Sequence, residues 1–471
     1  MPDAVPLFYA YKSQIPNLGI RSIAANLDMQ GVEVRYMDLV FSPKNISGII
    51  KEAILDFKPG LVGISAMTFQ YNTALKIMKI IKSIDAKVKI ALGGYHATLL
   101  YDQISPAEDL PFDYMIRNEG EKSFKELVKA LMGQNRDLSG IKGLSFRKNG
   151  GFVHNEKEEL IDLAQIKLPQ RNAHLFGFKG QAFGRVEAVE TSRGCTHECI
   201  FCSIANMYGR NFRKYSVERV IEDIKIAKES GAKRIFFVDD NITLDTMHFE
   251  KICEGIVGAG LNDMFFGAQL SSKGIARSEG LVKKMREANF ALVFLGIENI
   301  SKGRLESLGK GDIFNDSITA INYLHKYDIG IMGGFILGNP DDKLDDIKAC
   351  FRFARKSKVD LLMTQYLTPY PKTILREKLL STGLVEFKDE YWRYNGFNPI
   401  MRTKHLSLRE LEKHVVWLNI CWYLGEVFNP KNWFVKSKRV IRHVYFRLVI
   451  MTFIMVIDFA RGRYGKSIHR I

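Results

Sequence analysis

Cysteine is scarce in this sequence, and its scarcity excludes one class of protein. The chain has six cysteines among 471 residues, too few and too unevenly spaced for the disulfide framework of a secreted domain. A secretory leader is also lacking, because the N-terminal MPDAVPLFYAYKS has no basic segment followed by a long apolar run. These absences predict a cytoplasmic protein with reduced thiols.

Apolar runs alternate with helix-period stretches over residues 1–135. Candidate strands cover 5–10, 32–39, 61–67, 88–94 and 113–116, and candidate helices cover 18–30, 46–57, 72–84 and 121–132. Strands that alternate with helices pair in parallel, which predicts an open, doubly wound (flavodoxin-like) sheet. Ligands of such sheets bind beyond the carboxyl ends of the strands, where this chain has Ser65 and Thr68 in one loop and Gly93 and Gly94 in another. A simple turn is the alternative role for the two glycines.

The same segment resembles the cobalamin-binding domain found at the N-terminus of many radical S-adenosylmethionine (radical SAM) enzymes. The matching pieces occur in order: PNLGIRSIAANL (16–27), PGLVGISAMT (59–68), ALGGYHAT (91–98) and DYMIRNEGEKSFKELV (113–128). The resemblance implies that Ser65, Thr68, Gly93 and Gly94 contact the corrin ring or its nucleotide tail. Many relatives have an Asp-x-His-x-x-Gly motif after the first strand, whose histidine ligates cobalt, but this chain has YKSQIPNLG there. We therefore expect cobalamin bound without a protein histidine ligand.

Residues 136–184 are predicted to be a connector. Asn149 and Gly150 form a hairpin signal between two short strand-like runs. The following PQRNAHLFGFKGQAFG has no clear hydrophobic period, which predicts a linker.

Half of the cysteines are crowded into one segment, TSRGCTHECIFCSI (191–204). Cys195, Cys199 and Cys202 place three thiolates on one loop, and thiolates bind zinc or iron–sulfur clusters. A structural zinc site needs four ligands, yet His197 lies inside the loop and no second cysteine pair follows at zinc-ribbon spacing. Three cysteines on a four-iron cluster leave one iron open for chemistry. The ligand pattern therefore favours a cluster, with zinc as the alternative.

The CxxxCxxC spacing, with Phe201 before its last cysteine, resembles the signature of radical SAM enzymes. The resemblance implies a 4Fe-4S cluster held by the three cysteines, whose open iron chelates the amino and carboxylate groups of S-adenosylmethionine (SAM). The other cysteines, Cys253, Cys350 and Cys421, lie in helical contexts and are expected to be small buried hydrophobes.

Five further apolar runs, separated by helical stretches, predict a partial (β/α)6 barrel over residues 185–385. They cover residues 234–241, 264–272, 291–299, 329–340 and 359–371. Barrel enzymes carry their sites at the carboxyl ends of the strands, where this chain has Asp239, Asp240, Glu298, Gly338 and Pro340. Helix capping is the alternative role for each carboxylate.

The family resemblance implies roles in SAM binding for this set. Glu298 matches an acid that contacts the nucleoside or amino-acid part of SAM, and Gly338 with Pro340 matches a Gly-x-Pro turn. Asp239 and Asp240 stand where many families have Gly-Gly-Glu, which leaves open which of them holds the amino group. Residues 368–373 resemble a motif beside the adenine.

The resemblance thus implies a cobalamin-dependent radical SAM methyltransferase that forms a 5′-deoxyadenosyl radical and takes electrons from a flavodoxin or ferredoxin. Cyclisation, ring contraction or C–C coupling on the same architecture is the alternative. A non-catalytic zinc or cluster module is a third reading, but it leaves the strand-end acids and loop glycines unexplained. Methylthiotransferases are disfavoured, because no cysteine precedes Cys195.

The C-terminal region, residues 386–471, is predicted to be helical and ends in a basic tail. Residues 431–471 contain ten Lys and Arg against one acid, Asp458, which is more than half of the net charge of +16. The apolar segment 448–457 has ten residues, whereas a membrane-spanning helix needs about 20. A core helix is one alternative, and the interleaved apolar residues argue against nucleic acid. We expect the tail to dock on the inner face of a membrane and the substrate to be lipid or isoprenoid-like.

Overall fold

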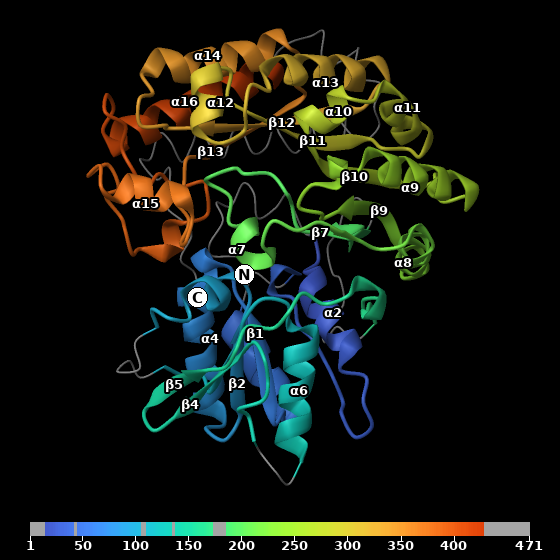
Figure 1. Cartoon of the computed structure of the whole chain (residues 1–471), viewed down its shortest axis with the longest axis vertical. Helices are drawn as coiled ribbons and strands as arrows, with labels where there is room; N and C mark the ends of the chain where they lie inside the picture. Colours follow the sequence, from blue (N-terminus) through green and yellow to red (C-terminus); the bar gives the residue numbers. More distant parts are fainter. Residues whose placement is uncertain (1–14, 42–44, 105–109, 134–136, 173–184, 428–471) are drawn as a thin grey trace.

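The computed structural model describes residues 15–41, 45–104, 110–133, 137–172 and 185–427. These residues form two α/β units, one above the other in Figure 1, with the short helix α7 (Ile204–Tyr208) between them. The candidate strand at 5–10, residues 11–14 of the YKSQIPNLG loop and the tail from residue 428 lie outside the described residues. The predictions made for these segments stay predictions.

The N-terminal unit is built on a five-stranded sheet in the order β1-β2-β3-β4-β5. β1 (Leu61–Ser65), β2 (Lys89–Gly93) and β3 (Tyr114–Ile116) pair in parallel, as the alternating pattern predicted. β4 (Leu144–Lys148) and β5 (Gly151–His154) form the predicted hairpin, with positive φ at both of its turn residues. β4 pairs antiparallel with β3, so the hairpin extends this sheet, whereas it was predicted to lie in a separate connector.

Helices cover both faces of this sheet. α3 (Ile46–Phe57) and α4 (Tyr71–Ile84) pack against Ile90 and Leu92 on one face, and α6 (Gly120–Met132) packs against Ala91 on the other. The buried residues of α3 are isoleucines four positions apart, which places them on one side of the helix. Residues 32–39 were predicted to be a strand but form none among the described residues, where Tyr36 makes only an isolated bridge.

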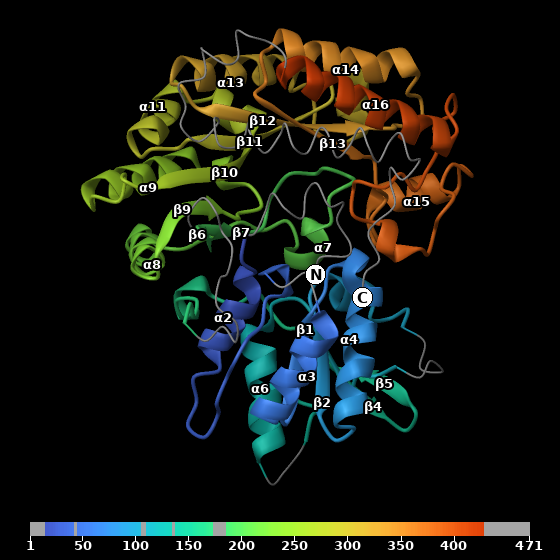
Figure 2. The same cartoon turned by 180° about the vertical axis from the view of Figure 1, so that it is seen from behind.

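The C-terminal unit has a six-stranded parallel sheet in the order β13-β12-β11-β10-β9-β6. The sheet curls into a half-barrel with helices along its outer side (Figures 1 and 2), which confirms the predicted partial (β/α)6 barrel. Its strands are β6 (Arg185–Val189), β9 (Ala232–Phe237), β10 (Phe265–Ser271), β11 (Leu292–Glu298), β12 (Gly330–Leu337) and β13 (Leu361–Tyr366). The outer helices are α8 (Val217–Glu229), α9 (Thr246–Gly258), α11 (Glu279–Glu287), α13 (Phe314–Lys326) and α14 (Leu344–Lys356).

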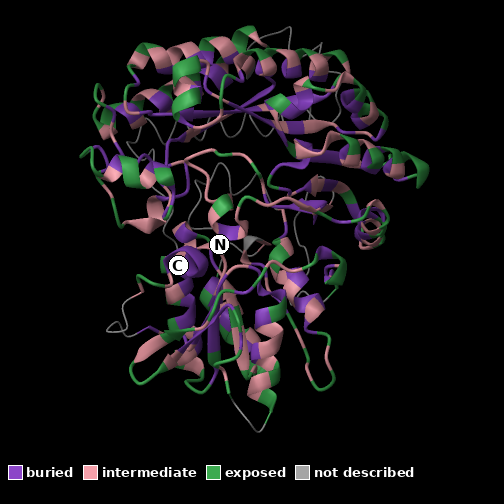
Figure 3. Ribbon diagram, in the orientation of Figure 1, coloured by how far each residue is buried: buried purple, intermediate pink, exposed green. Residues whose placement is uncertain are grey.

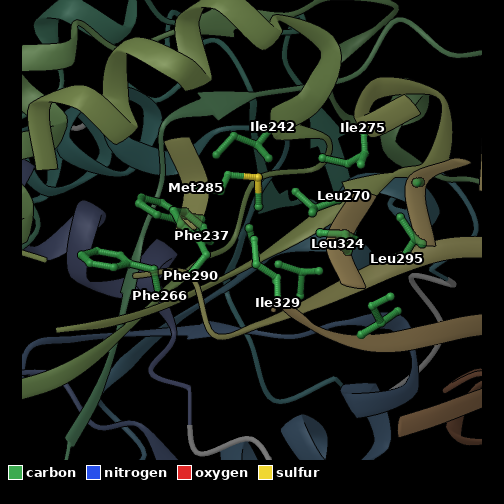
Figure 4. Close-up of a cluster of buried hydrophobic side chains, with 14 of the residues drawn as sticks. Phe237, Ile242, Phe266, Leu270, Ile275, Met285, Phe290, Leu295, Leu324 and Ile329 are labelled. Atoms are coloured by element: carbon green, nitrogen blue, oxygen red, sulfur yellow. The ribbon is translucent and has the colours of Figure 1, made fainter. Parts of the chain in front are cut away.

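The barrel core lies between the sheet and these outer helices (Figures 3 and 4). Phe237, Phe266 and Phe290 stack with ring centroids 5.6–6.0 Å apart. Cys253 and Cys350 are buried in the same cluster, as predicted. Cys421 is exposed on α16 (Leu408–Val427), so the prediction that it is a buried hydrophobe is wrong.

The C-terminal region contacts both units. α16 packs on α14 of the barrel, and the short helix η6 (Tyr391–Arg393) packs on α4 and on η3 (Thr68–Gln70) of the N-terminal unit. In the part of the chain that the structure describes, no helix combines the length and apolar character needed to cross a membrane.

Candidate active site between the two α/β units

The three cysteines of the CxxxCxxC segment lie on one loop between β7 (Ser192–Arg193) and α7. The loop is tightly turned, because the backbone N–H of Cys202 donates to the carbonyl of Cys199 (3.1 Å). Gly194 starts the loop at φ +87°, and any side chain there would collide with the carbonyl of Asn211. The backbone of Ile200 bonds to Leu308 on one side (3.1 Å) and to Leu375 on the other (3.0 Å), which fixes the loop against the barrel.

All three thiols are free and partly buried. Burial raises the pKa of the Cys199 thiol and raises that of Cys202 to about 12. Bound metal would therefore replace protons at these sulfurs. Among the described residues, no three His, Cys, Asp or Glu side chains are grouped closely enough to hold one metal ion. In a four-iron cluster, each of the three cysteines would bind a different iron.

The two neighbouring aspartates after β9 have different partners. The Asp239 carboxylate accepts hydrogen bonds from the hydroxyls of Thr191 and Ser192 (both 2.6 Å) and from the Thr191 N–H, so it positions the strand that leads to the cluster loop. Burial raises the pKa of Asp239 to about 7. Asp240 is more exposed, and desolvation by the surrounding protein raises its pKa to about 6. Asp240 accepts the N–H of Gly194 (2.9 Å), which places its carboxylate beside the cluster loop. The direct contact with SAM expected of each residue stays a prediction.

Glu298 lies at the carboxyl end of β11 and pairs with a lysine that the sequence did not single out. Its oxygen Oε1 is 2.8 Å from Lys310 Nζ, and both side chains are less than one-fifth exposed, at 12% and 16%. The backbone of Glu298 has φ +63°, an unfavourable conformation for a residue with a side chain, which is typical of functional sites. Burial alone would lower the pKa of Lys310, but Glu298 and the Cys199 thiol raise it above its usual value.

Of the remaining predicted SAM residues, Phe201 lies on the cysteine loop, whereas Gly338 and Pro340 follow β12. Phe201 packs with Leu308 and Leu375, and Lys310 lies 5.8 Å from the centre of its ring. The Gly338 N–H donates to Asp342 (3.0 Å), and the carbonyl of Pro340 accepts from Lys404 (2.8 Å). The predicted roles of Phe201, Gly338 and Pro340 in binding SAM stay predictions.

The predicted cobalamin loops lie side by side at the carboxyl ends of two neighbouring strands. Ser65 pairs in register with Gly93, and the N–H of Ala66 donates to the Gly93 carbonyl (3.0 Å). Gly94 has φ +89°, and a Cβ there would lie 2.7 Å from the carbonyl oxygen of Ala66. Thr68 is buried at the start of η3. This edge combines hydroxyl groups with closely packed backbone, which suits a ligand that approaches the main chain.

A histidine follows these glycines. The His96 ring is stacked on Tyr71 with centroids 3.7 Å apart and meets Tyr391 of η6 edge-on at 5.6 Å. Its Nδ1 atom is buried and has no hydrogen-bond partner. Burial lowers the pKa of His96 to about 3, so the ring is neutral at physiological pH.

Tyr95 begins α5 (Tyr95–Leu100), the helix that brings the cobalamin edge to the cluster loop. α5 packs against α7, the helix that follows the three cysteines. Burial raises the pKa of Tyr95, and the groups that raise it further are Tyr208 of α7, Asp240 and the Cys202 thiol. Neither Tyr95 nor Lys310 carried a sequence signal of its own, because only the packing of distant segments brings them to the cysteines.

The arrangement can hold a reactive group away from water. Three thiols, two carboxylates with raised pKa values and one ammonium group lie where two domains meet; Asp239 is buried, the thiols and Lys310 are partly buried, and Asp240 is exposed. Exclusion of water strengthens their electrostatic interactions and suppresses side reactions of bound intermediates.

Two family models match the two units. Residues 6–128 match the B12 binding domain, and residues 189–354 match the radical SAM superfamily.

Curated relatives match most of the chain. An uncharacterised methyltransferase of Pyrococcus horikoshii, PH0819, is 34% identical over 87% of this chain and 88% of its own length. The anaerobic magnesium-protoporphyrin IX monomethyl ester cyclase of Cereibacter sphaeroides is 27% identical over 77% of this chain and 59% of its own length. The hopanoid C-3 methylase of Methylococcus capsulatus is 26% identical over 76% of this chain and 67% of its own length.

Solved structures share the fold at low identity. The radical SAM methyltransferase TsrM of Kitasatospora setae, with cobalamin and a [4Fe-4S] cluster bound, has a TM-score of 0.67 at 18% identity and matches 78% of this chain and 77% of its own. The cobalamin-dependent radical SAM enzyme OxsB has a TM-score of 0.71 at 16% identity and matches 98% of this chain and 75% of its own.

Proposed function

This chain belongs to the cobalamin-dependent radical SAM methyltransferase family, and from that premise we propose that it methylates an unactivated carbon of an apolar substrate. The observation that carries the proposal is the meeting of two site edges. The cobalamin edge after β1 and β2 leads into α5, which packs against α7 directly after the cluster loop, and Asn118 after β3 donates from Nδ2 to the carbonyl of Met207 in α7 (2.7 Å).

Each group in this site has a defined task under the proposal. Cys195, Cys199 and Cys202 would each bind one iron, and the ammonium of Lys310 would attract the carboxylate of SAM. Glu298 would keep that ammonium in place through their 2.8 Å contact. When bound, the cluster supplies the electron that cleaves SAM to methionine and a 5′-deoxyadenosyl radical, and cobalamin carries the methyl group. An acidic electron-transfer protein such as flavodoxin or ferredoxin would supply the electrons.

Cobalamin would be held without a protein histidine on cobalt. The YKSQIPNLG loop contains no histidine. His96, the histidine next to the predicted cobalamin loops, is stacked face to face on Tyr71, so its ring is engaged by aromatic packing. We expect the nucleotide base of cobalamin to be off cobalt as well, so electron paramagnetic resonance of the Co(II) form should lack nitrogen superhyperfine splitting. Splitting from an axial nitrogen would contradict this part of the proposal.

An apolar substrate is supported by two observations. The hopanoid C-3 methylase is named for a lipid, and the tail of this chain combines apolar residues with nine net positive charges over residues 431–471. Such a segment suits an anionic membrane surface. Under the proposal, the protein works in the cytoplasm at the inner face of the membrane, where a lipid or isoprenoid-like substrate is presented.

A cyclase on the same architecture is the second candidate, because the Cereibacter relative is a cyclase by name. Methyl transfer consumes a second SAM molecule and releases S-adenosylhomocysteine, whereas cyclisation without methyl transfer does not. The amount of S-adenosylhomocysteine formed by the enzyme therefore separates the two candidates.

The proposed radical chemistry is tested by reconstitution under anaerobic conditions. The protein should bind about four irons and cleave SAM to 5′-deoxyadenosine when a reductant is present. Cys199→Ala should lose both properties, whereas the matched control Cys253→Ala should keep them, because Cys253 is buried in α9 within the barrel core. Stoichiometric zinc without cleavage of SAM would show that the radical proposal is wrong.

A further inference from the structure

A buried ionic network joins the two units next to the cluster loop. Its centre is Arg193 in β7, two residues before Cys195, with a side chain that is 8% exposed. Arg193 donates to three carboxylates: from Nε to Glu190 (2.8 Å), from Nη1 to Glu119 (2.9 Å) and from Nη2 to Glu121 (2.8 Å). The planar guanidinium allows one side chain to make all three contacts.

Two of these carboxylates come from the cobalamin-binding unit. Glu119 is the N-cap residue of α6 and Glu121 lies in its first turn, where the helix dipole favours negative charge. Glu121 also accepts a hydrogen bond from the hydroxyl of Ser22 in α2 (Leu18–Asn26) (2.7 Å). Glu119 accepts two hydrogen bonds from Arg213 of β8 (Arg213–Lys214) (2.9 and 3.0 Å). Helices α2 and α6 are thereby connected to β7 and β8, the small sheet that frames the cluster loop.

The network depends on Arg193. Burial alone would raise the pKa of Glu121, but Arg193 lowers it below its usual value. Burial raises the pKa of Glu190 in spite of the same guanidinium. Loss of the forked contacts would leave buried carboxylates with fewer charged hydrogen-bond donors, which destabilises the folded protein.

A second contact connects the cobalamin-binding unit to the other end of the cluster segment. Asn118 Nδ2 donates to the carbonyl of Met207 in α7 (2.7 Å). Cobalamin-unit residues 118–121 therefore hold the cluster segment before its first cysteine and after its last. A further buried ion pair between the units, Arg21 with Glu187, lies on β6, away from this segment.

We propose that Arg193 is a positioning residue that sets the docking of the cobalamin-binding unit on the cluster loop. This docking places the two sites so that SAM bound at the cluster can also deliver its methyl group to the cobalamin edge. The inference rests on the proposed function, because it assumes that both cofactors are used.

The test compares Arg193→Lys with the matched control Arg21→Lys. Lysine keeps the charge in both variants but cannot make the forked contacts, and both original residues are buried between the units. Each holoenzyme, loaded with cluster and cobalamin, is given reductant and SAM alone, and 5′-deoxyadenosine and S-adenosylhomocysteine are quantified. We expect Arg193→Lys to form as much 5′-deoxyadenosine as the wild type. The amount of S-adenosylhomocysteine that it forms should be lower on the order of tenfold. Arg21→Lys should keep the wild-type ratio.

Hydrogen exchange of the apoproteins gives a readout that does not depend on activity. Residues 191–214 should exchange faster in Arg193→Lys than in the wild type, and at the wild-type rate in Arg21→Lys. If Arg193→Lys does not fold, Glu121→Gln removes the partner charge from the other unit and should change the product ratio in the same direction.

An unchanged product ratio in a folded Arg193→Lys variant, or the same change in Arg21→Lys, would overturn the inference. If the wild type forms neither nucleoside, the proposed function fails. In that case the hydrogen-exchange comparison still decides whether Arg193 holds the cluster segment.

Discussion

Replacement of His96 by phenylalanine should make the apoprotein less sensitive to acid. The side chain is 2% exposed and stacks on Tyr71 at the predicted cobalamin edge. Burial lowers the pKa of His96 to about 3, so the folded protein keeps this ring neutral in mild acid. Phenylalanine keeps an aromatic ring on Tyr71 and removes the titrating group.

The size of the effect follows from proton linkage. In the unfolded chain the histidine has a pKa of about 6.5, so below that pH the unfolded state binds a proton that the folded state does not. The contribution of His96 to the stability of the folded protein is therefore present above about pH 6.5, and it is lost as the pH falls toward the pKa of His96 in the folded state. When the pH falls from about 7.5 to about 5.5, protonation of this residue in the unfolded state should lower the free energy of unfolding of the wild type by about 1.4 kcal/mol. For a domain of this size that corresponds to about 3 to 6 °C in Tm.

The assay is thermal unfolding of the apoproteins at the two pH values. The fall in Tm on acidification should be smaller in His96→Phe than in the wild type by the amount given above. Tyr391→Phe changes the same aromatic cluster without removing the histidine and should keep the wild-type pH dependence. An equal fall in the wild type and in His96→Phe would refute the reasoning.

Two further predictions concern the barrel and the tail. Lys310→Met should lower the free energy of unfolding by about 3 to 5 kcal/mol, because it leaves the mostly buried Glu298 without its cation. Lys310→Arg keeps the positive charge and should lower this free energy much less. Equal decreases in the two variants, measured by denaturant titration, would contradict the role of the pair. The full-length protein should float with anionic liposomes in a salt-sensitive way, and deletion of residues 432–471 should abolish flotation. If the intact protein ignores the liposomes, the proposed membrane contact is wrong.

Much of the fold was predictable because the local patterns are strong. The isoleucines of 46–57 repeat at helical spacing, and the structure has a helix with those bounds. The five apolar runs after residue 230 each overlap a barrel strand, because parallel strands that are buried on both faces have continuous apolar sequences. One boundary differs, since β9 begins at Ala232, two residues before the predicted run. The stretch 32–39 also alternates like a strand, but among the described residues it forms only an isolated bridge at Tyr36.

The candidate site was predictable only where one short segment carries it. The three cysteines lie within eight positions, so their spacing alone predicts that they bind a metal centre. Lys310 lies in a loop after α12 (Lys302–Ser307) and is 5.8 Å from the ring of Phe201 in the cysteine segment. Arg193 contacts carboxylates more than 70 residues away. Such contacts arise from tertiary packing and leave no periodic signal. Asp239 has a structural role that its place at a strand end did not reveal, because its carboxylate accepts hydrogen bonds from Thr191 and Ser192.

The central claim is that one chain uses a cluster and cobalamin together to transfer a methyl group. It is tested most directly by the amount of S-adenosylhomocysteine that the cluster-loaded protein forms from SAM and reductant, with and without added cobalamin. We predict that S-adenosylhomocysteine forms only when cobalamin is present. Equal amounts with and without cobalamin, or none in either case while 5′-deoxyadenosine accumulates, would contradict the claim.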